Sequence, residues 1–141
     1  KRLKDHVGDL FLCTYGDGLS NVNINKLLKF HNLNKSLITV TAVRPLSRFG
    51  IINLTGNRIK KFKEKSKMSE GWINGGFFVI NKKFIKLIKN NSTILEREPL
   101  EKAARSGELV AYKHFGFWQC MDTKRDKDNL NRIFKKNKKF I

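Results

Sequence analysis

Two aspartates at the ends of apolar segments could bind a metal ion together with phosphate. Asp17 lies between two glycines, and Asp122 follows the apolar run 117–121. Mg²⁺ prefers a few protein carboxylates, completed by water and by substrate phosphate oxygens. Each aspartate also has an ordinary interpretation, Asp17 as a turn residue and Asp122 or Thr123 as the cap of a following helix. A shared magnesium site is the hypothesis that uses both aspartates at once.

The segment 71–79 is a predicted strand that three glycines and an asparagine interrupt. Glycine weakens a strand because it costs backbone entropy and fills no core volume. Such a run is expected where the backbone comes close to a ligand. Asn74 offers a donor and an acceptor to vicinal sugar hydroxyls, and Gly75 and Gly76 expose peptide groups. The alternative is a β-bulge or close packing against another element.

Three further side chains could contact a ligand, but their residue types and positions are less specific. Lys65 follows a predicted strand and could hold a phosphate oxygen as a compact point charge. Other lysines surround it at positions 60, 61, 63 and 67, so composition does not choose among them. Trp72 and Trp118 could stack on a sugar ring, although tryptophan more often packs in a core.

Length and composition limit the class of protein. A chain of 141 residues that is 40% hydrophobic is one domain or part of one. Its net charge of +18 comes mostly from lysines beside asparagine and isoleucine, without a nucleic-acid-binding motif. We therefore expect anionic small substrates rather than nucleic acid. No stretch of about 18 apolar residues, long enough to cross a membrane, and no signal peptide is evident. We therefore expect a cytoplasmic protein without a membrane partner.

Two other features of the sequence bear on its setting. Cys13 and Cys120 lie in apolar segments without a metal-ligand pattern, so we expect buried free thiols in a reducing compartment. The first residue is Lys1 rather than Met, and we therefore expect that the sequence begins partway through a longer product or was trimmed.

The pattern of apolar residues alternates between strands and helices. Expected strands cover 9–15, 36–43, 49–54, 58–63, 72–80, 108–114 and 117–121, and expected helices cover 25–34, 81–90, 99–106 and 127–139. Asn23 is the expected cap of the first helix, and residues 55–57 are the expected turn of a hairpin. Alternation of this kind predicts an α/β domain with a mixed, mainly parallel sheet. In such sheets ligands bind at the carboxyl ends of the strands, where Asp17 and Asp122 are placed.

Taken together, these motifs resemble the sugar-1-phosphate nucleotidylyltransferases, and within that family the members that use CTP and glucose 1-phosphate. The matching runs are FLCTYGDGL at 11–19, TVTAVRP at 39–45, Glu64-Lys65, GWINGGFFV at 71–79, LEREPL at 95–100 and AYKHFGFWQCMDTKRDK at 111–127. They follow the family order over nearly the whole chain. Ser66 stands where the family usually has proline after the Glu-Lys pair, and Lys124 where it often has leucine.

The resemblance implies a Rossmann-like nucleotidyltransferase fold, of which residues 1–141 are the later part, with the N-terminal portion missing. It implies that CTP and glucose 1-phosphate give CDP-glucose and pyrophosphate, for deoxysugar and surface polysaccharide synthesis. Its expected groups are Mg²⁺ on Asp17 and Asp122, and substrate contacts at Gly16, Glu64, Lys65, Asn74 and Gly75. It also implies a homo-oligomer.

Three alternatives remain open on the sequence alone. The first is a nucleotidyltransferase that uses UTP or dTTP, because the base-reading segments of the family would precede Lys1. The second is a non-catalytic basic module that binds nucleic acid or polyphosphate. The third is a chain that keeps the sugar side of the site and is inactive in isolation.

Overall fold

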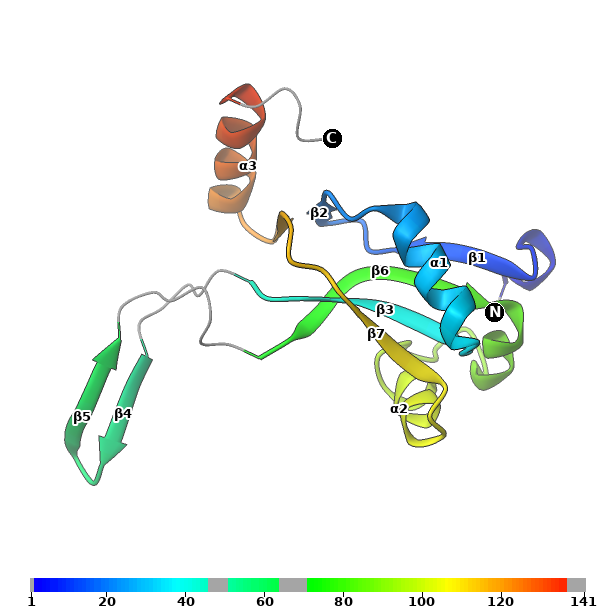
Figure 1. Cartoon of the computed structure of the whole chain (residues 1–141), viewed down its shortest axis with the longest axis horizontal. Helices are drawn as coiled ribbons and strands as arrows, with labels where there is room; N and C mark the ends of the chain where they lie inside the picture. The colour runs from blue at the N-terminus through cyan, green and yellow to red at the C-terminus, as the bar shows by residue number, and fades with distance from the viewer. Residues whose placement is uncertain (1, 46–50, 64–70, 137–141) are drawn as a thin grey trace.

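The computed structural model describes residues 2–45, 51–63 and 71–136, and Figure 1 shows a central sheet with helices packed around it. No helix in these ranges is long and apolar enough to cross a membrane. The elements, of which η1 and η2 are 3₁₀ helices, are η1 (Lys4–His6), β1 (Leu10–Thr14), β2 (Gly18–Ser20), α1 (Ile24–Asn34), β3 (Ile38–Val43), β4 (Ile51–Thr55), β5 (Arg58–Lys63), β6 (Ile73–Asn81), η2 (Lys82–Leu87), α2 (Glu98–Arg105), β7 (Leu109–Lys113), β8 (Trp118–Cys120) and α3 (Lys124–Lys136).

The central sheet has the strand order β1-β6-β3-β7 and is mostly antiparallel. Strands β3 and β7 run parallel, whereas β6 is antiparallel to both of its neighbours, β1 and β3. The expected α/β class and mixed sheet are confirmed, but the expectation of a mainly parallel sheet is wrong. Strands β1 and β3 run in the same direction, and α1 lies in the connection between them, as is usual for a crossover. Strand β6 then inserts between them in the opposite direction, and no local pattern reveals that insertion.

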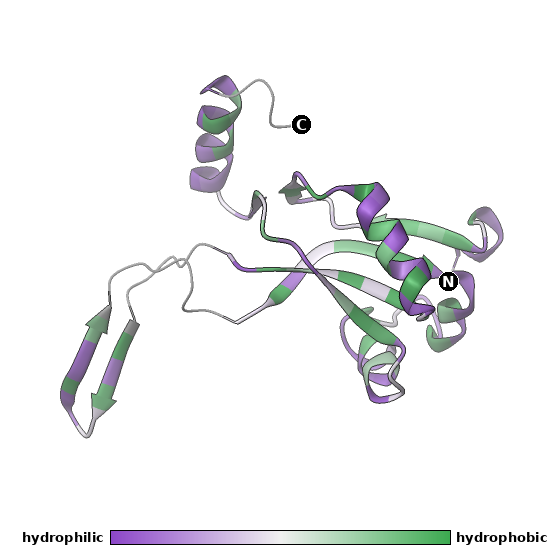
Figure 2. Ribbon diagram, in the orientation of Figure 1, coloured by the Kyte–Doolittle hydropathy of each residue, from purple (hydrophilic) through white to green (hydrophobic). Residues whose placement is uncertain are grey.

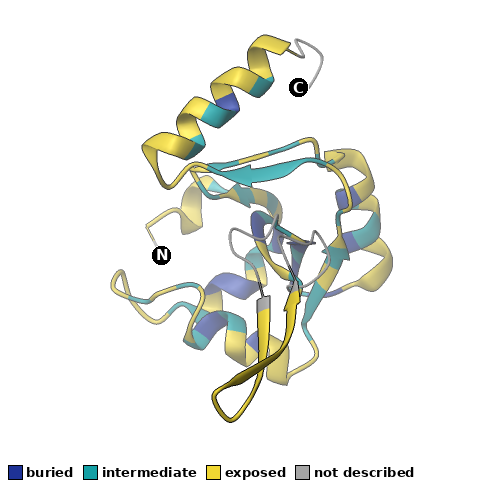
Figure 3. Cartoon of the chain, turned by 90° about the vertical axis from the view of Figure 1, so that its left-hand side faces the viewer, coloured by how far each residue is buried: buried dark blue, intermediate teal, exposed yellow. Residues whose placement is uncertain are grey.

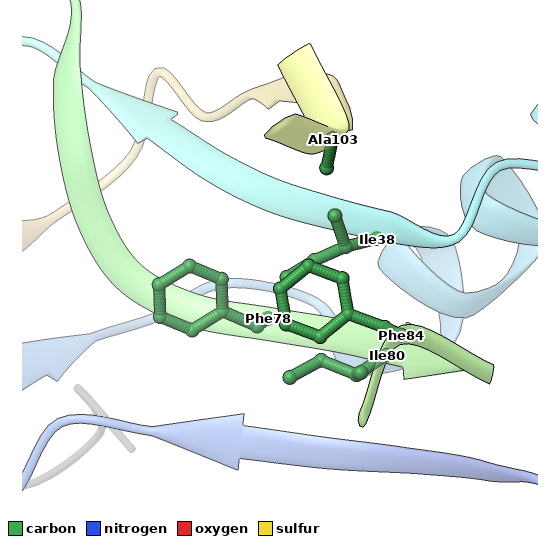
Figure 4. Close-up of a cluster of buried hydrophobic side chains, with 5 residues drawn as sticks. All are labelled: Ile38, Phe78, Ile80, Phe84 and Ala103. Carbon is green, nitrogen blue, oxygen red and sulfur yellow. The ribbon is translucent and has the colours of Figure 1, made fainter. Parts of the chain in front are cut away.

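One face of the sheet is covered by η2 and α2. Ile38 of β3 and Phe78 and Ile80 of β6 form a buried cluster with Phe84 of η2 and Ala103 of α2, as Figure 4 shows. Side chains two residues apart on β6 share this face because successive strand residues point to opposite sides. Burial of a side chain such as Phe78 contributes about 1.5–3 kcal/mol to stability. The helix expected over 81–90 is present only as the shorter 3₁₀ helix η2.

The other face of the sheet is covered by α1, which begins as the sequence predicts. The Asn23 side chain accepts a hydrogen bond from the Lys26 N–H and caps the helix. Leu27 and His31 are its buried residues. The His31 Nδ1 lies 2.8 Å from the Thr39 hydroxyl of β3, and burial lowers the pKa of this histidine. Helix α1 thereby fixes the strand that follows it.

Strands β4 and β5 form the hairpin that the turn sequence predicts. Gly56 adopts a φ of 55° in the turn, which glycine tolerates without strain. The hairpin extends away from the sheet in Figure 1, and every residue from 52 to 62 is exposed (Figure 3). Apolar and polar residues are interspersed along both strands, as Figure 2 shows. A two-stranded hairpin is marginally stable by itself in water.

The last helix, α3, begins at a capping box. The Thr123 hydroxyl accepts from the Asp126 N–H at 3.2 Å, and the Asp126 carboxylate accepts from the Thr123 N–H at 3.1 Å. The expected apolar stripe of this helix is only partly covered, with Leu130 buried and Phe134 54% exposed. The helix starts three residues before the expected Lys127, and positions 137–139 lie outside the described residues.

Candidate functional site

The two segments that carry the candidate metal aspartates are joined by a short ladder between β2 and β8. Strand β2, which the sequence pattern did not predict, pairs Gly18 with Cys120 in antiparallel register. One step further, the Met121 N–H donates to the Asp17 carbonyl oxygen at 2.9 Å. Asp122 therefore follows the residue that is hydrogen-bonded to Asp17. The structure thus places side by side two segments that are far apart in the sequence.

The surroundings of Asp122 separate its two interpretations. The Cys120 thiol donates to the Asp122 Oδ2 at 3.2 Å, and both Asp122 and Asp17 are exposed. Thr123, together with Asp126, caps α3, so the capping role does not fall on Asp122. Neither cysteine forms a disulfide, as expected, but both are half-buried rather than buried.

The donor set at this place is small. Within residues 2–45, 51–63 and 71–136, no group of three or more His, Cys, Asp or Glu side chains could hold a metal ion. Two carboxylates alone would leave most coordination positions to water and to a ligand. That division suits Mg²⁺, which dehydrates reluctantly and is commonly bound through one or two carboxylates plus phosphate oxygens.

Gly16 leaves open space next to Asp17. A Cβ atom added at Gly16 would have no heavy atom of the described structure within 4 Å, and its backbone is not in the left-handed region. Nothing in the fold therefore requires glycine at this position. The described residues therefore leave space beside the Asp17 backbone. The expected approach of a ligand at this place stays a prediction.

The glycines of β6 are enclosed instead. Val40 pairs with Phe78 and Ala42 with Asn74, so residues 75–77 bulge opposite a single residue of β3. A Cβ at Gly75 would lie 2.8 Å from the Val43 Cγ1 and 2.9 Å from the Thr41 carbonyl oxygen. A Cβ at Gly76, whose φ is 75°, would lie 2.5 Å from a Tyr15 ring carbon. The bulge and close packing, weighed as the alternative in the sequence, account for both of these glycines.

Asn74 precedes the bulge and is exposed, but its amide is already engaged. Its Oδ1 accepts from the Gly76 N–H at 2.9 Å, and its Nδ2 donates to the Tyr15 hydroxyl at 2.8 Å. The Tyr15 hydroxyl donates in turn to the Glu96 carboxylate. Burial, followed by the hydrogen bond with Glu96, raises the pKa of Tyr15 to about 12, so the phenol is neutral near pH 7.

Sequence reasoning missed the part that Tyr15 and Glu96 play beside Asn74. Tyr15 directly precedes the Gly-Asp-Gly run, which was the available signal for it. Glu96 lies in the LEREPL run and carries no local signal, because its partner is 81 residues away in the sequence. The neighbouring Glu98 carboxylate forms ion pairs with Lys89 at 2.7 Å and with Lys102 at 2.9 Å.

Both tryptophans are half-buried and have structural contacts. The Trp118 indole N–H donates to the Gly75 carbonyl oxygen at 2.8 Å and so joins β8 to the bulge of β6. The Arg44 guanidinium lies over the Trp72 ring, with 4.6 Å between the Cζ and the ring centroid. Phe115 packs edge-on against the same ring at 5.3 Å.

Two expected substrate contacts, Glu64 and Lys65, lie outside the described residues, between β5 and β6. Their roles therefore stay predictions. The described part of the expected site consists of Gly16, Asp17, Asn74, Gly75 and Asp122.

The sequence was compared with known proteins. The family described as Nucleotidyl transferase matches residues 2–119. Glucose-1-phosphate cytidylyltransferase of Salmonella typhimurium is 44% identical over 140 residues, which are 98% of this chain and 54% of that protein. Mannose-1-phosphate guanylyltransferase 1 of Arabidopsis thaliana is 30% identical over 89% of this chain and 36% of that protein. The chain thus spans about half the length of the Salmonella protein.

A solved structure shares the fold. The crystal structure of HddC from Yersinia pseudotuberculosis superposes with a TM-score of 0.69 and 18% identity, covering 94% of this chain and 59% of that chain. The strand order and the helices around the sheet are therefore those of a known fold.

Proposed function

Since the chain belongs to the nucleotidyl transferase family, we propose that it carries the metal and sugar-phosphate side of a glucose-1-phosphate cytidylyltransferase. Residues 1–141 would be the later part of one nucleotidyltransferase domain. The reaction transfers a cytidylyl group from CTP to glucose 1-phosphate, giving CDP-glucose and pyrophosphate. The choice of these two substrates is supported by the similarity to the Salmonella protein along nearly the whole chain.

The observation that carries the proposal is the hydrogen bond between the Met121 N–H and the Asp17 carbonyl oxygen. It joins the FLCTYGDGL and AYKHFGFWQCMDTKRDK runs, which are the ends of the resemblance. A fold that kept these runs apart would leave each aspartate as an ordinary surface residue. The contact between these two runs, beside the open space at Gly16, supports a single site for a charged ligand.

Asp17 and Asp122 suit a magnesium ion because they are exposed carboxylates on two segments that lie side by side, with open space at Gly16. When bound there, Mg²⁺ would supply charge neutralisation between two polyanionic substrates. The remaining coordination positions would be filled by water and phosphate oxygens, as this ion prefers.

The other proposed residues bind and orient the sugar phosphate. Asn74 would contact hexose hydroxyls, while Gly16 and Gly75 would offer backbone groups. Glu64 would bind the sugar and Lys65 its phosphate, as the resemblance implies. An oxygen of the sugar phosphate then attacks the α-phosphorus of CTP as the bond to the β-phosphate breaks, and pyrophosphate leaves. No general base is needed, because the attacking phosphate is already ionised, so positioning and charge complementarity do most of the work.

The test uses the intact protein expressed from its natural gene, with CTP, glucose 1-phosphate and Mg²⁺. Asp17→Asn and Asp122→Asn should each lower kcat on the order of 10³-fold while the melting temperature stays unchanged. Asp128→Asn, an exposed aspartate on α3, is the matched control and should keep normal turnover. Near-normal CDP-glucose synthesis in either of the first two variants would remove the proposed metal site.

The same assay separates the alternatives. Faster turnover with UTP or dTTP than with CTP would replace the nucleotide in the proposal. Binding that needs neither Mg²⁺ nor a sugar phosphate and falls with salt alone would favour a polyanion-binding module, since counterion release controls that kind of affinity. The expected homo-oligomer stays a prediction, which light scattering on the purified protein would check.

A further inference from the structure

The Tyr15 hydroxyl lies at the junction of three segments beside the proposed sugar contact. It accepts from the Asn74 Nδ2 at 2.8 Å and donates to the Glu96 carboxylate. Tyr15 directly follows β1, Asn74 is on β6, and Glu96 precedes α2. The hydroxyl therefore connects elements from three parts of the chain at one exposed residue, Asn74.

The direction of this hydrogen-bond chain is fixed at both of its ends. The Gly76 N–H can only donate, so the Asn74 Oδ1 must be the atom that faces it at 2.9 Å. A carboxylate oxygen of Glu96 accepts from the Tyr15 hydroxyl, so Tyr15 must accept from Asn74. Both constraints select the same orientation of the Asn74 amide. One amide hydrogen and one lone pair of Asn74 remain for a ligand, in a defined direction.

The Tyr15 ring is itself held in place by packing. It lies edge-on against Phe78 of the core with 5.5 Å between ring centroids. Its backbone N–H donates to the Gly76 carbonyl oxygen at 2.9 Å, and its ring occupies the space that a Cβ at Gly76 would need. The hydroxyl is thus placed by the core rather than by a mobile surface contact.

We propose that Tyr15, anchored by Glu96, is a positioning residue that sets the Asn74 amide for the hydroxyls of the sugar phosphate. The proposal rests on the function proposed above and adds a specificity element to it. Tyr15 acts through Asn74 and does not touch the substrate. A polyhydroxylated ligand benefits from this arrangement because an amide already in the right orientation need not be ordered on binding.

The kinetic test compares Tyr15→Phe with Tyr112→Phe in the intact protein. The first variant removes only the hydroxyl and keeps the ring against Phe78, while Tyr112 packs on Phe30 away from Asn74. Tyr15→Phe should raise KM for glucose 1-phosphate about tenfold, the value of one lost hydrogen bond. KM for CTP, kcat and the melting temperature should stay unchanged, and Tyr112→Phe should change none of them. An unchanged KM for glucose 1-phosphate, or an equal rise for CTP, would overturn the proposal.

A double variant tests whether Glu96 acts through Tyr15. Glu96→Gln leaves a side chain that can donate or accept, so the direction of the chain is no longer dictated. Added to Tyr15→Phe, it should raise KM for glucose 1-phosphate no further, because coupled residues are non-additive. A multiplied effect would mean that Glu96 contacts the sugar itself, and would overturn the proposed role of Tyr15 as its partner.

A readout without catalysis distinguishes failure of this proposal from failure of the proposed function. In an ¹⁵N nuclear magnetic resonance spectrum, the Asn74 side-chain amide of the unmodified protein should exchange slowly with water, and in Tyr15→Phe it should exchange rapidly. Unchanged protection in the variant would overturn the positioning role even if CDP-glucose is made. Absence of CDP-glucose synthesis by the unmodified protein would contradict the function, while the amide signal would still decide the positioning.

Discussion

The glycines at 16 and at 75–76 resemble each other in sequence and differ in structure. Around Gly16 there is open space, and its backbone conformation suits any residue. Gly75 and Gly76 are buried, with Thr41, Val43 and Tyr15 in the space that a side chain would need. One segment is glycine-rich beside a place that a ligand can reach, and the other is glycine-rich because strands approach closely.

This difference teaches that a glycine-broken strand is not by itself a ligand cradle. The run at 71–79 was the expected place of closest ligand approach, yet its two central glycines are explained by the bulge opposite Thr41. On this segment the side chain proposed to face the ligand is that of Asn74, which the bulge orients through the Gly76 N–H. Close packing of the glycines would therefore serve the proposed site by placing Asn74.

The largest effect should come from Gly76→Ala. Its φ of 75° is strained for alanine, and the new Cβ would overlap the Tyr15 ring. We expect a loss of about 3 kcal/mol in the free energy of unfolding, measured by urea denaturation. Gly107→Ala is the matched control, because Gly107 has a φ of 73° with nothing within 4 Å, and it should cost only about 1 kcal/mol. Equal losses would show that the ring contact at Gly76 does not matter.

Gly75→Ala should be next, with a loss of about 2 kcal/mol. The new Cβ would meet the Thr41 carbonyl oxygen and the buried Val43, neither of which is the flexible end of a long side chain. Gly8→Ala, which meets only an ordinary contact at 3.7 Å, should change stability by less than about 0.5 kcal/mol in the same denaturation experiment. A Gly75 variant as stable as the Gly8 variant would contradict the close packing described for β6.

Gly16→Ala should have the smallest effect on stability, a change within about 0.5 kcal/mol, because its surroundings are open. It should nevertheless raise KM for CTP or glucose 1-phosphate several-fold, since the methyl group would occupy space proposed for the ligand. Steady-state kinetics and denaturation on the same preparation check both parts. Unchanged kinetics would place the ligand elsewhere and would remove the functional side of the comparison.

Much of the fold could be predicted because its signals are local. The Asn23 cap, the hairpin turn at Gly56 and the Pro99 near the start of α2 are short-range features, and each element formed where they indicated. The direction of the sheet could not be predicted, because β6 pairs between β1 and β3 through contacts distant in sequence. Strand β2 was missed because its Gly-Leu-Ser sequence has no strand signal without β8 beside it.

For the candidate site, residue type and position in the sequence supply a prediction, and the structure bears only on where the segments lie. Asp17 and Asp122 were expected together, and the ladder between β2 and β8 places their segments side by side. The Tyr15–Glu96 contact was not predictable, because the two residues lie 81 positions apart in the sequence and neither carries a local signal for the other. Roles for Glu64 and Lys65 stay predictions, since neither residue is among those described.

The central claim is that Asp17 and Asp122 hold one metal ion, and paramagnetic broadening by Mn²⁺ tests it most directly. Substoichiometric Mn²⁺ added to the ¹⁵N-labelled intact protein with CTP should broaden the amide signals of residues 16–18 and 121–123 together. Asp122→Asn should remove the broadening at both segments, whereas Asp128→Asn should leave it intact. Broadening at residues 16–18 that survives Asp122→Asn would contradict a shared ion.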